Sequence, residues 1–115
     1  MLFRSARGAV AESVVSGLLA ERGWSTVDRN WRGGGGELDL VVRREGRLRF
    51  VEVKVRAQAD SLTDDAVSPH KRRRLRAAAE AWLASQPEPD EVCFLVAFVD
   101  TLVEPWRVRF VDDAF

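Results

Sequence analysis

Asp39, Glu52 and Lys54 have the residue types and the spacing for metal-dependent chemistry. They lie in the stretch 37–56, where two β-rich runs alternate apolar with polar residues on either side of a short turn at Gly46. This pattern favours a β-hairpin in which Gly46 takes the positive φ of a two-residue turn. In that register Asp39 faces Glu52 across the two strands. A three-residue turn would slip the register by one and separate the two carboxylates.

Two carboxylates that face each other destabilise a sheet unless something compensates their charges. Mg²⁺ would do so, because it commonly binds one or two carboxylates together with water and a substrate phosphate. Lys54 follows Glu52 by two residues and therefore points to the same face, where its ammonium would suit a phosphate or an attacking water. The alternative is an exposed strand face with mixed charges. The pattern alone leaves both interpretations open.

Length and composition fit one domain over residues 1–115, because 115 residues at 46% hydrophobic content are enough for a single core. No apolar run is long enough to span a membrane and no signal peptide is evident, so a cytoplasmic protein with no membrane partner is expected. The single Cys93 excludes a disulfide within the chain and, in its apolar run, is expected to be buried.

The net charge is zero, but the charges are distributed unevenly along the chain. Up to Arg76 there are 16 basic and 10 acidic residues, and after it 2 basic and 8 acidic. The basic part contains the predicted hairpin and would attract a polyanion such as DNA. Segregated charge is equally suited to self-association, so a homodimer stays open.

A helix is predicted over residues 5–22, and Gly23 is expected at its C-cap. Its apolar stripe is formed by Val10, Val14, Val15, Leu18 and Leu19. Glu12 lies at the border of the stripe, and Gly8 and Ser16, one turn away on either side, are small enough to admit a ligand. A solvated helix glutamate is the alternative interpretation of Glu12.

A second helix is predicted to begin after Ser68, which would cap it, with Pro69 in its first turn and an apolar stripe ending at Leu83. Cations crowd its beginning, where the helix dipole disfavours them, which suggests a use such as phosphate contact, and a solvated charged face is the alternative interpretation. The candidate nucleic-acid contacts are four residues at the start of this helix and one that directly precedes the glycine run 33–36. They are Lys71, Arg72, Arg73 and Arg74 in the helix, and Arg32 before the glycines.

Strands are also predicted at residues 24–31, 92–99 and 106–110, with a loop at 57–67. The apolar run 92–99 is typical of a strand buried on both faces in the middle of a sheet. The order helix, three strands, helix, two strands predicts an α/β (α+β) fold with a mixed five-stranded β-sheet flanked by helices. Trp31 is interpreted as covering the core, with nucleic-acid stacking as the alternative. The glycine run 33–36 is interpreted as a flexible turn that could let backbone approach a substrate.

Several short motifs in this order resemble the YraN-like family of small bacterial proteins. They are Arg7-Gly8, Ala11-Glu12, Asn30-Trp31-Arg32, Gly36-Glu37-Leu38-Asp39-Leu40, Phe50-Val51-Glu52-Val53-Lys54, and Val67 followed by Lys71 and Leu75. That family is similar to Holliday-junction resolvases and to PD-(D/E)xK nucleases of the restriction-endonuclease-like fold. The resemblance implies metal ligands at Asp39 and Glu52, a catalytic lysine at Lys54 and a helix carboxylate at Glu12. Leu95 stands where the family often has Asp, which removes a possible support for the site.

The leading hypothesis is therefore a DNA endonuclease that uses Mg²⁺ or Mn²⁺, with branched DNA among its candidate substrates and with no small-molecule cofactor. Its catalytic residues would be Glu12, Asp39, Glu52 and Lys54, and its metal ligands Asp39 and Glu52. The alternative is a catalytically inactive nucleic-acid-binding or adaptor protein that keeps the nuclease fold in DNA repair, recombination or uptake.

Overall fold

The computed structural model describes residues 6–56 and 68–112. The elements are α1 (Ala6–Glu21), β1 (Ser25–Gly33), β2 (Gly36–Arg44), β3 (Arg47–Arg56), α2 (Pro69–Leu83), β4 (Glu91–Asp100) and β5 (Arg107–Asp112). This α+β order is the predicted one. The loop expected at 57–67 lies outside the described residues.

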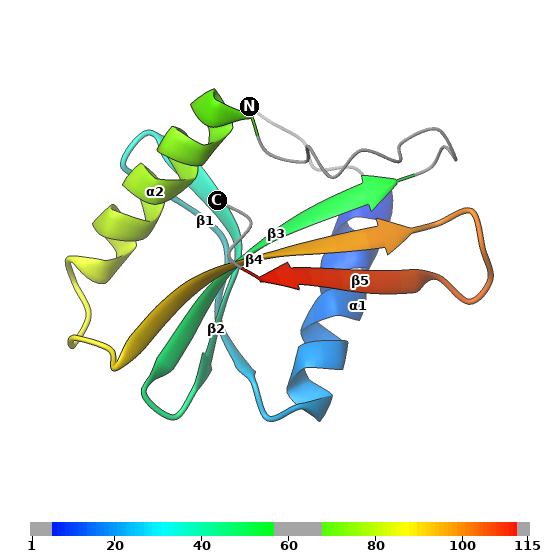
Figure 1. Ribbon diagram of the computed structural model, residues 1–115, viewed down its shortest axis with the longest axis horizontal. Coiled ribbons are helices and arrows are strands. Elements are labelled where there is room, and N and C mark those ends of the chain that lie inside the picture. Colours follow the sequence, from blue (N-terminus) through cyan, green and yellow to red (C-terminus); the bar gives the residue numbers. More distant parts are fainter. Residues whose placement is uncertain (1–5, 57–67, 113–115) are drawn as a thin grey trace.

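The five strands form one mixed sheet in the order β1-β2-β3-β4-β5 (Figure 1). β1, β2 and β3 are antiparallel neighbours, β3 and β4 run parallel, and β5 returns antiparallel to β4. The parallel pair needs a crossover, and α2 lies in that connection. The apolar β4 therefore has a neighbour on both sides, as predicted, and β5 forms an edge.

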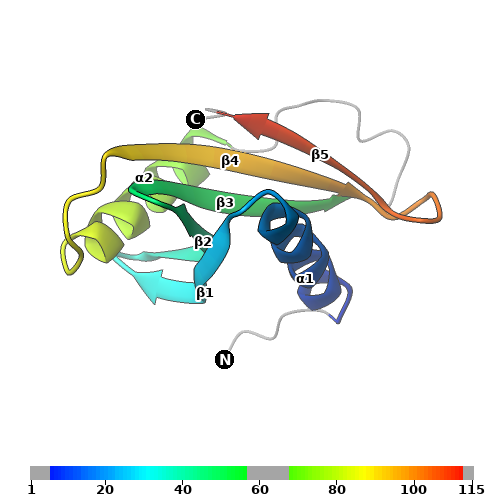
Figure 2. The same cartoon turned by 90° about the horizontal axis from the view of Figure 1, so that it is seen from below.

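The two helices cover the two faces of the sheet, with α2 and α1 well separated in Figures 1 and 2. On one face is the α2-side core: Leu38, Val41, Leu48, Phe50, Leu75, Ala78, Ala79, Trp82, Val96 and Phe98. On the other is the α1-side core: Ala11, Val15, Leu19, Trp24, Leu40, Val42, Val51, Leu95, Ala97 and Val99. Trp31 packs against the α2-side core, as the core interpretation of this residue predicted. The central strands are thus buried on both faces.

The β2–β3 hairpin has the predicted register, from Arg44 opposite Arg47 to Leu40 opposite Val51. The predicted backbone of its turn is wrong, because the residue with positive φ is Glu45, at 57°, and not Gly46. Gly46 is needed for another reason. A Cβ on it would collide with the Asp90 side chain, and its carbonyl accepts a hydrogen bond from the Asp90 amide at 2.8 Å.

The predicted stripe of the first helix is confirmed at Val15 and Leu19, which are buried, but it is wrong at Val10. Val10, expected in the core, is 50% exposed, whereas Ala11 and Glu12 are 0% and 1% exposed. The helix ends at Glu21, one residue before the predicted end, and the expected capping residue Gly23 has a φ of 89°. The observed phase of α1 buries a carboxylate that the sequence placed at the border of the stripe.

The glycine run forms a two-residue turn between β1 and β2, in which Gly34 and Gly35 have φ values of 60° and 83°. α2 lies against it. A Cβ on Gly34 would lie 2.5 Å from the carbonyl oxygen of Ala77, and one on Gly36 would collide with the carbonyl of Arg74. The absence of side chains at Gly34 and Gly36 therefore lets the backbone of α2 pack closely against this turn.

α2 begins as predicted, since Ser68 Oγ accepts a hydrogen bond from the Lys71 amide at 3.2 Å. Cys93 is half-buried and not in the core, which corrects the expected burial; its Sγ donates to Glu91 Oε1 at 3.4 Å. Among the described residues, no helix combines the length and the apolar character needed to cross a membrane.

Candidate functional site

The candidate site lies where β2 and β3 separate. Their ladder ends at the pair Leu40–Val51, and one residue further Asp39 Oδ2 accepts a hydrogen bond from the Val53 amide at 2.9 Å. A side-chain oxygen thus satisfies an amide next to the end of the ladder. Leu38 belongs to the α2-side core and Leu40 to the α1-side core, so the strand alternation breaks at Asp39.

Asp39 and Glu52 line one pocket of about 430 Å³, although the β2–β3 ladder ends at Leu40–Val51, before the predicted pair Asp39–Glu52. The side of the pocket opposite the strands comes from the start of α2. The complete lining is Gly36, Glu37, Asp39, Glu52, His70, Lys71, Arg74 and Leu75. We call it the carboxylate pocket. Asp39 is 9% exposed and Glu52 6%, so both acids are largely removed from water.

Burial raises the pKa of the Glu52 carboxyl from 4.5 to about 7, with a smaller contribution in the same direction from the nearby Asp39. Lys71 and Lys54 act in the opposite direction, since positive charges favour the ionised form. Lys71 is in direct contact, with Nζ 2.8 Å from Glu52 Oε1. The site therefore concentrates negative charge that the cations around it only partly compensate.

Lys54 lies on the same face of β3 as Glu52. Val53 and Val55, which alternate with it, pack against the α1-side core, so Lys54 points to the opposite side. The charge of Lys54 acts on Glu52, but the residue is not part of the pocket lining. The structure thus brings Lys54 near the carboxylates at the rim of the site.

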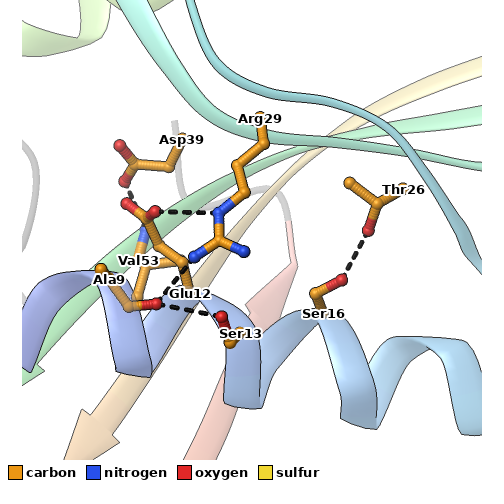
Figure 3. Close-up of polar contacts among 8 residues, drawn as sticks. All are labelled: Ala9, Glu12, Ser13, Ser16, Thr26, Arg29, Asp39 and Val53. Carbon is orange, nitrogen blue, oxygen red and sulfur yellow. Dashed lines mark hydrogen bonds and ion pairs between the residues drawn. The ribbon is translucent and has the colours of Figure 1, made fainter.

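Glu12 approaches from α1, and Figure 3 shows its contacts together with the Asp39–Val53 hydrogen bond. Arg29 of β1 donates from Nε to Glu12 Oε1 at 3.4 Å and from Nη2 to the Ala9 carbonyl at 2.7 Å. Arg29 of β1 thus contacts α1 at two points, the buried carboxylate of Glu12 and the carbonyl of Ala9. Sequence reasoning missed Arg29, because its role follows from the burial of Glu12, which needs a cation nearby and which the sequence did not reveal.

The predicted nucleic-acid contacts fall into two groups. Lys71 and Arg74 point toward the sheet, where Lys71 pairs with Glu52 and Arg74 Nε donates to the Gly35 carbonyl at 3.2 Å. Arg72 and Arg73 are exposed on the outside of α2. The remaining candidate, Arg32, is also exposed, with its Nη2 3.9 Å from Glu37 Oε2.

A second hollow of about 360 Å³ extends the carboxylate pocket over the glycine turn. It is lined by Arg32, Gly33, Gly35, Gly36, Glu37 and Arg74, and thus shares three residues with the carboxylate pocket. Together the two hollows form a groove that has the buried acids at one end and Arg32 at the other. Its width over the glycines depends on the absence of side chains there.

Asp39 and Glu52 fit a divalent cation chemically, because both are buried oxygen ligands and their mutual repulsion is relieved by a positive ion. Within 6–56 and 68–112, no three His, Cys, Asp or Glu side chains group closely enough for an all-protein metal site. A cation here would therefore be held by two carboxylates, with water or phosphate completing its coordination.

Residues 11–108 match the Uncharacterised protein family UPF0102. The chain belongs to this family. A UPF0102 protein of Synechococcus sp. strain CC9902 is 41% identical over 109 residues, which cover 91% of this chain and 90% of the relative. A UPF0102 protein of Nitratidesulfovibrio vulgaris strain DP4 is 44% identical over 97% of this chain and 85% of its own. The resemblance to the YraN-like family is thereby confirmed, since UPF0102 is that family.

The departure at Leu95 of this UPF0102 protein lies away from the carboxylate pocket. Leu95 belongs to the α1-side core and faces Asp112 in the β4–β5 register. An aspartate at this position would point to the α1 side, whereas Glu52 points to the α2 side. Having Leu95 in place of an aspartate therefore does not remove a polar group from the immediate surroundings of Asp39 and Glu52.

Proposed function

We propose that this UPF0102 protein is a Mg²⁺- or Mn²⁺-dependent phosphodiesterase that cleaves DNA. The observation that carries the proposal is the pair of buried carboxylates, Asp39 and Glu52, in a groove bordered by cations. Burying like charges together costs stability, and a structural role would be served as well by an apolar pair. A site that must hold a cation and a phosphate accounts for both the acids and the surrounding bases.

In this proposal Asp39 and Glu52 hold the cation, and Glu52 must lose its proton to do so. The bound cation would polarise the phosphate and lower the pKa of a water molecule. Lys54, on the same face as Glu52, holds a phosphate oxygen or orients the attacking water. Arg29 and Glu12 are positioning residues, because they join α1 to β1 beside the point where β2 and β3 separate.

The groove favours a polyanionic substrate over a small one. Arg74 and Arg32 line it beyond the carboxylates, where they could contact further phosphates of a continuous backbone. Arg72 and Arg73, on the outside of α2, extend the basic surface. The proposed substrate is DNA in branched or flapped form. The proposed location of the activity is the cytoplasm.

The second candidate function is a DNA-binding adaptor without turnover. One observation favours it: Lys71 Nζ already contacts Glu52 Oε1 at 2.8 Å and supplies part of the compensating charge without a metal. In the enzyme, Lys71 must share Glu52 with the cation or turn toward the phosphate. In the adaptor, the Lys71–Glu52 ion pair is permanent and only fixes α2 against β3.

A cleavage assay distinguishes the two functions. Linear, flapped and four-way DNA are incubated with the protein in Mg²⁺, Mn²⁺ or EDTA, alongside Glu52→Gln and the exposed control Glu80→Gln. The enzyme requires cleavage by the wild type and by Glu80→Gln with either metal, and none in EDTA or with Glu52→Gln. Cleavage that survives in Glu52→Gln comes from a contaminant or another site. Binding without any cleavage would establish the adaptor.

A further inference from the structure

A pocket rich in arginine lies at the other end of β3 from the carboxylates, on the α1 side of the sheet. Its volume is about 250 Å³. It is lined by Leu19, Arg22, Trp24, Arg44, Arg47, Arg49, Leu95, Phe110 and Asp112. We call it the arginine pocket. Its walls come from the end of α1, the β2–β3 turn and the edge strand β5, so the fold assembles it from distant segments.

Two of the four guanidinium groups of this pocket, those of Arg22 and Arg49, lie over aromatic rings, and Arg49 also contacts an acid. Arg49 lies over Trp24 at 4.9 Å from the ring centroid, and its Nη1 is 3.0 Å from Asp112 Oδ1. Arg22 lies over Phe110 at 5.2 Å. Cation–π contact and a charge-assisted hydrogen bond restrict these long side chains, so their donors are preorganised.

The charges of the arginine pocket are unbalanced. Four arginines line it against one acid, Asp112, and Glu91 lies 3.8 Å from Arg49 and 4.0 Å from Arg47. Arg44 and Arg47 also face each other directly in the β2–β3 ladder. Like charges in that position destabilise a hairpin. As with the carboxylates, the arrangement becomes favourable when an ion of opposite charge is bound.

We propose that the arginine pocket is a phosphate-binding site, separate from the carboxylate pocket. Guanidinium groups present paired N–H donors that match phosphate oxygens, and several converging guanidiniums suit a group with three or more acceptors. A single carboxylate would satisfy only one such pair. The phosphate belongs either to the backbone of a nucleic acid or to a free phosphate compound.

The two sites would contact different parts of a nucleic acid. Arg47 and Glu52 are five residues apart on one extended strand, which separates them by about 17 Å, and they point to opposite faces. A strand whose phosphate reaches the carboxylates must therefore turn around the hairpin to reach the arginines, or a second strand must bind there. This proposal needs neither metal nor cleavage and stands apart from the proposed function.

The test compares two double variants that remove the same charge. Arg44→Ala/Arg47→Ala empties the pocket of its two opposed arginines. Arg43→Ala/Arg107→Ala removes two exposed arginines on the other face of the same sheet, since Arg43 faces Leu48 of the α2-side core. NMR spectra of both variants in EDTA first show that they are folded, and inorganic phosphate is then titrated while the Trp24 and Arg49 side-chain N–H signals are followed.

Saturable shifts of these signals are expected in the wild type and in Arg43→Ala/Arg107→Ala, and at least a tenfold weaker response in Arg44→Ala/Arg47→Ala. A short single-stranded DNA identifies the source of the phosphate. If the source is a nucleic acid, the slope of log DNA affinity against log salt for Arg44→Ala/Arg47→Ala is smaller than that of the wild type by about 1.4, because two phosphate contacts are lost. If only the inorganic phosphate response is lost, the site takes a free phosphate compound. Equal responses of the two double variants to both probes would overturn the proposal.

Discussion

Glu52→Gln keeps the size of a buried side chain and removes one of the two buried negative charges of the carboxylate pocket. The carboxyl of Glu52 has a pKa of 4.5 in the unfolded chain and of about 7 in the folded protein. Between these pH values the folded protein holds a proton that the unfolded chain releases. The free energy of unfolding of the wild type therefore falls as the pH rises through this window and then levels off.

The magnitude follows from the width of the window. Each pH unit between the two pKa values corresponds to about 1.4 kcal/mol, so the loss is on the order of 3 kcal/mol by pH 8. The glutamine of the variant does not titrate, so the variant should not lose this part of the free energy of unfolding as the pH rises. Relative to the wild type it should gain stability progressively from about pH 4.5 to about pH 7.

Urea unfolding of both proteins at about pH 5 and about pH 8 measures this difference directly. Glu80→Gln is the matched control, because it makes the same chemical change on the exposed side of α2. Its stability should follow the wild type at both pH values. If wild type and Glu52→Gln instead show parallel pH dependence, then Glu52 is not the group that titrates in the window. The inference that burial, with a smaller contribution from Asp39, raises the pKa of Glu52 would then be wrong.

Four further results are expected. Thermal melts should show that Mn²⁺ stabilises the wild type and hardly affects Asp39→Asn, while the metal-free variant is equal to the wild type or more stable by about 0.2–1 kcal/mol; identical metal responses would exclude Asp39 as a ligand. Arg29→Ala should lower the free energy of unfolding in urea by roughly 2 kcal/mol, less than for a fully buried pair because Arg29 is 37% exposed, and Glu12→Gln should restore part of the loss; no rescue would contradict the pairing. Replacing Lys71, Arg72, Arg73 and Arg74 by Ala should weaken DNA binding similarly for all sequences in fluorescence anisotropy and flatten its salt dependence. An unchanged slope of log affinity against log salt would mean that these residues only form a solvated charged face. Gly34→Ala should cost more than about 1 kcal/mol by urea unfolding, because its φ of 60° and the nearby Ala77 carbonyl both oppose a side chain, whereas a neutral result would mean that α2 readily moves away.

The hairpin was predictable because its signal is local. Alternation along two strands and a two-residue turn determine which residues face each other, so the register from Arg44–Arg47 to Leu40–Val51 was predictable, whereas the break in alternation at Asp39 was not. The beginning of α2 was predictable for the same reason, since Ser68 and Pro69 act on the adjacent turn. Neither feature depends on which element packs against the sheet.

Burial of Glu12 was not predictable, because helical periodicity alone left the phase of α1 uncertain by one residue. Val10 is apolar and extends the stripe in one direction, whereas the small Ala11 fits closely against the sheet and turns Glu12 inward. Tertiary packing decides between these phases. The Lys71–Glu52 ion pair was equally hidden, since it joins residues on either side of the stretch 57–67. The charge of Lys71 is evident from its residue type, but its partner depends on how α2 packs against β3.

The two layers of helix give the acids of this protein different surroundings. Glu12, from α1, is 1% exposed and has the guanidinium of Arg29 within hydrogen-bond distance. Glu52, on the α2 side, lines a pocket, and its ion-pair partner is the flexible ammonium of Lys71, which is itself 42% exposed. A planar guanidinium fixed at two points holds its partner in place, whereas an exposed ammonium can move away at little cost. Of the two acids, Glu52 is therefore the one that can exchange its protein partner for a cation, and Glu12 the one that keeps the structure around it fixed.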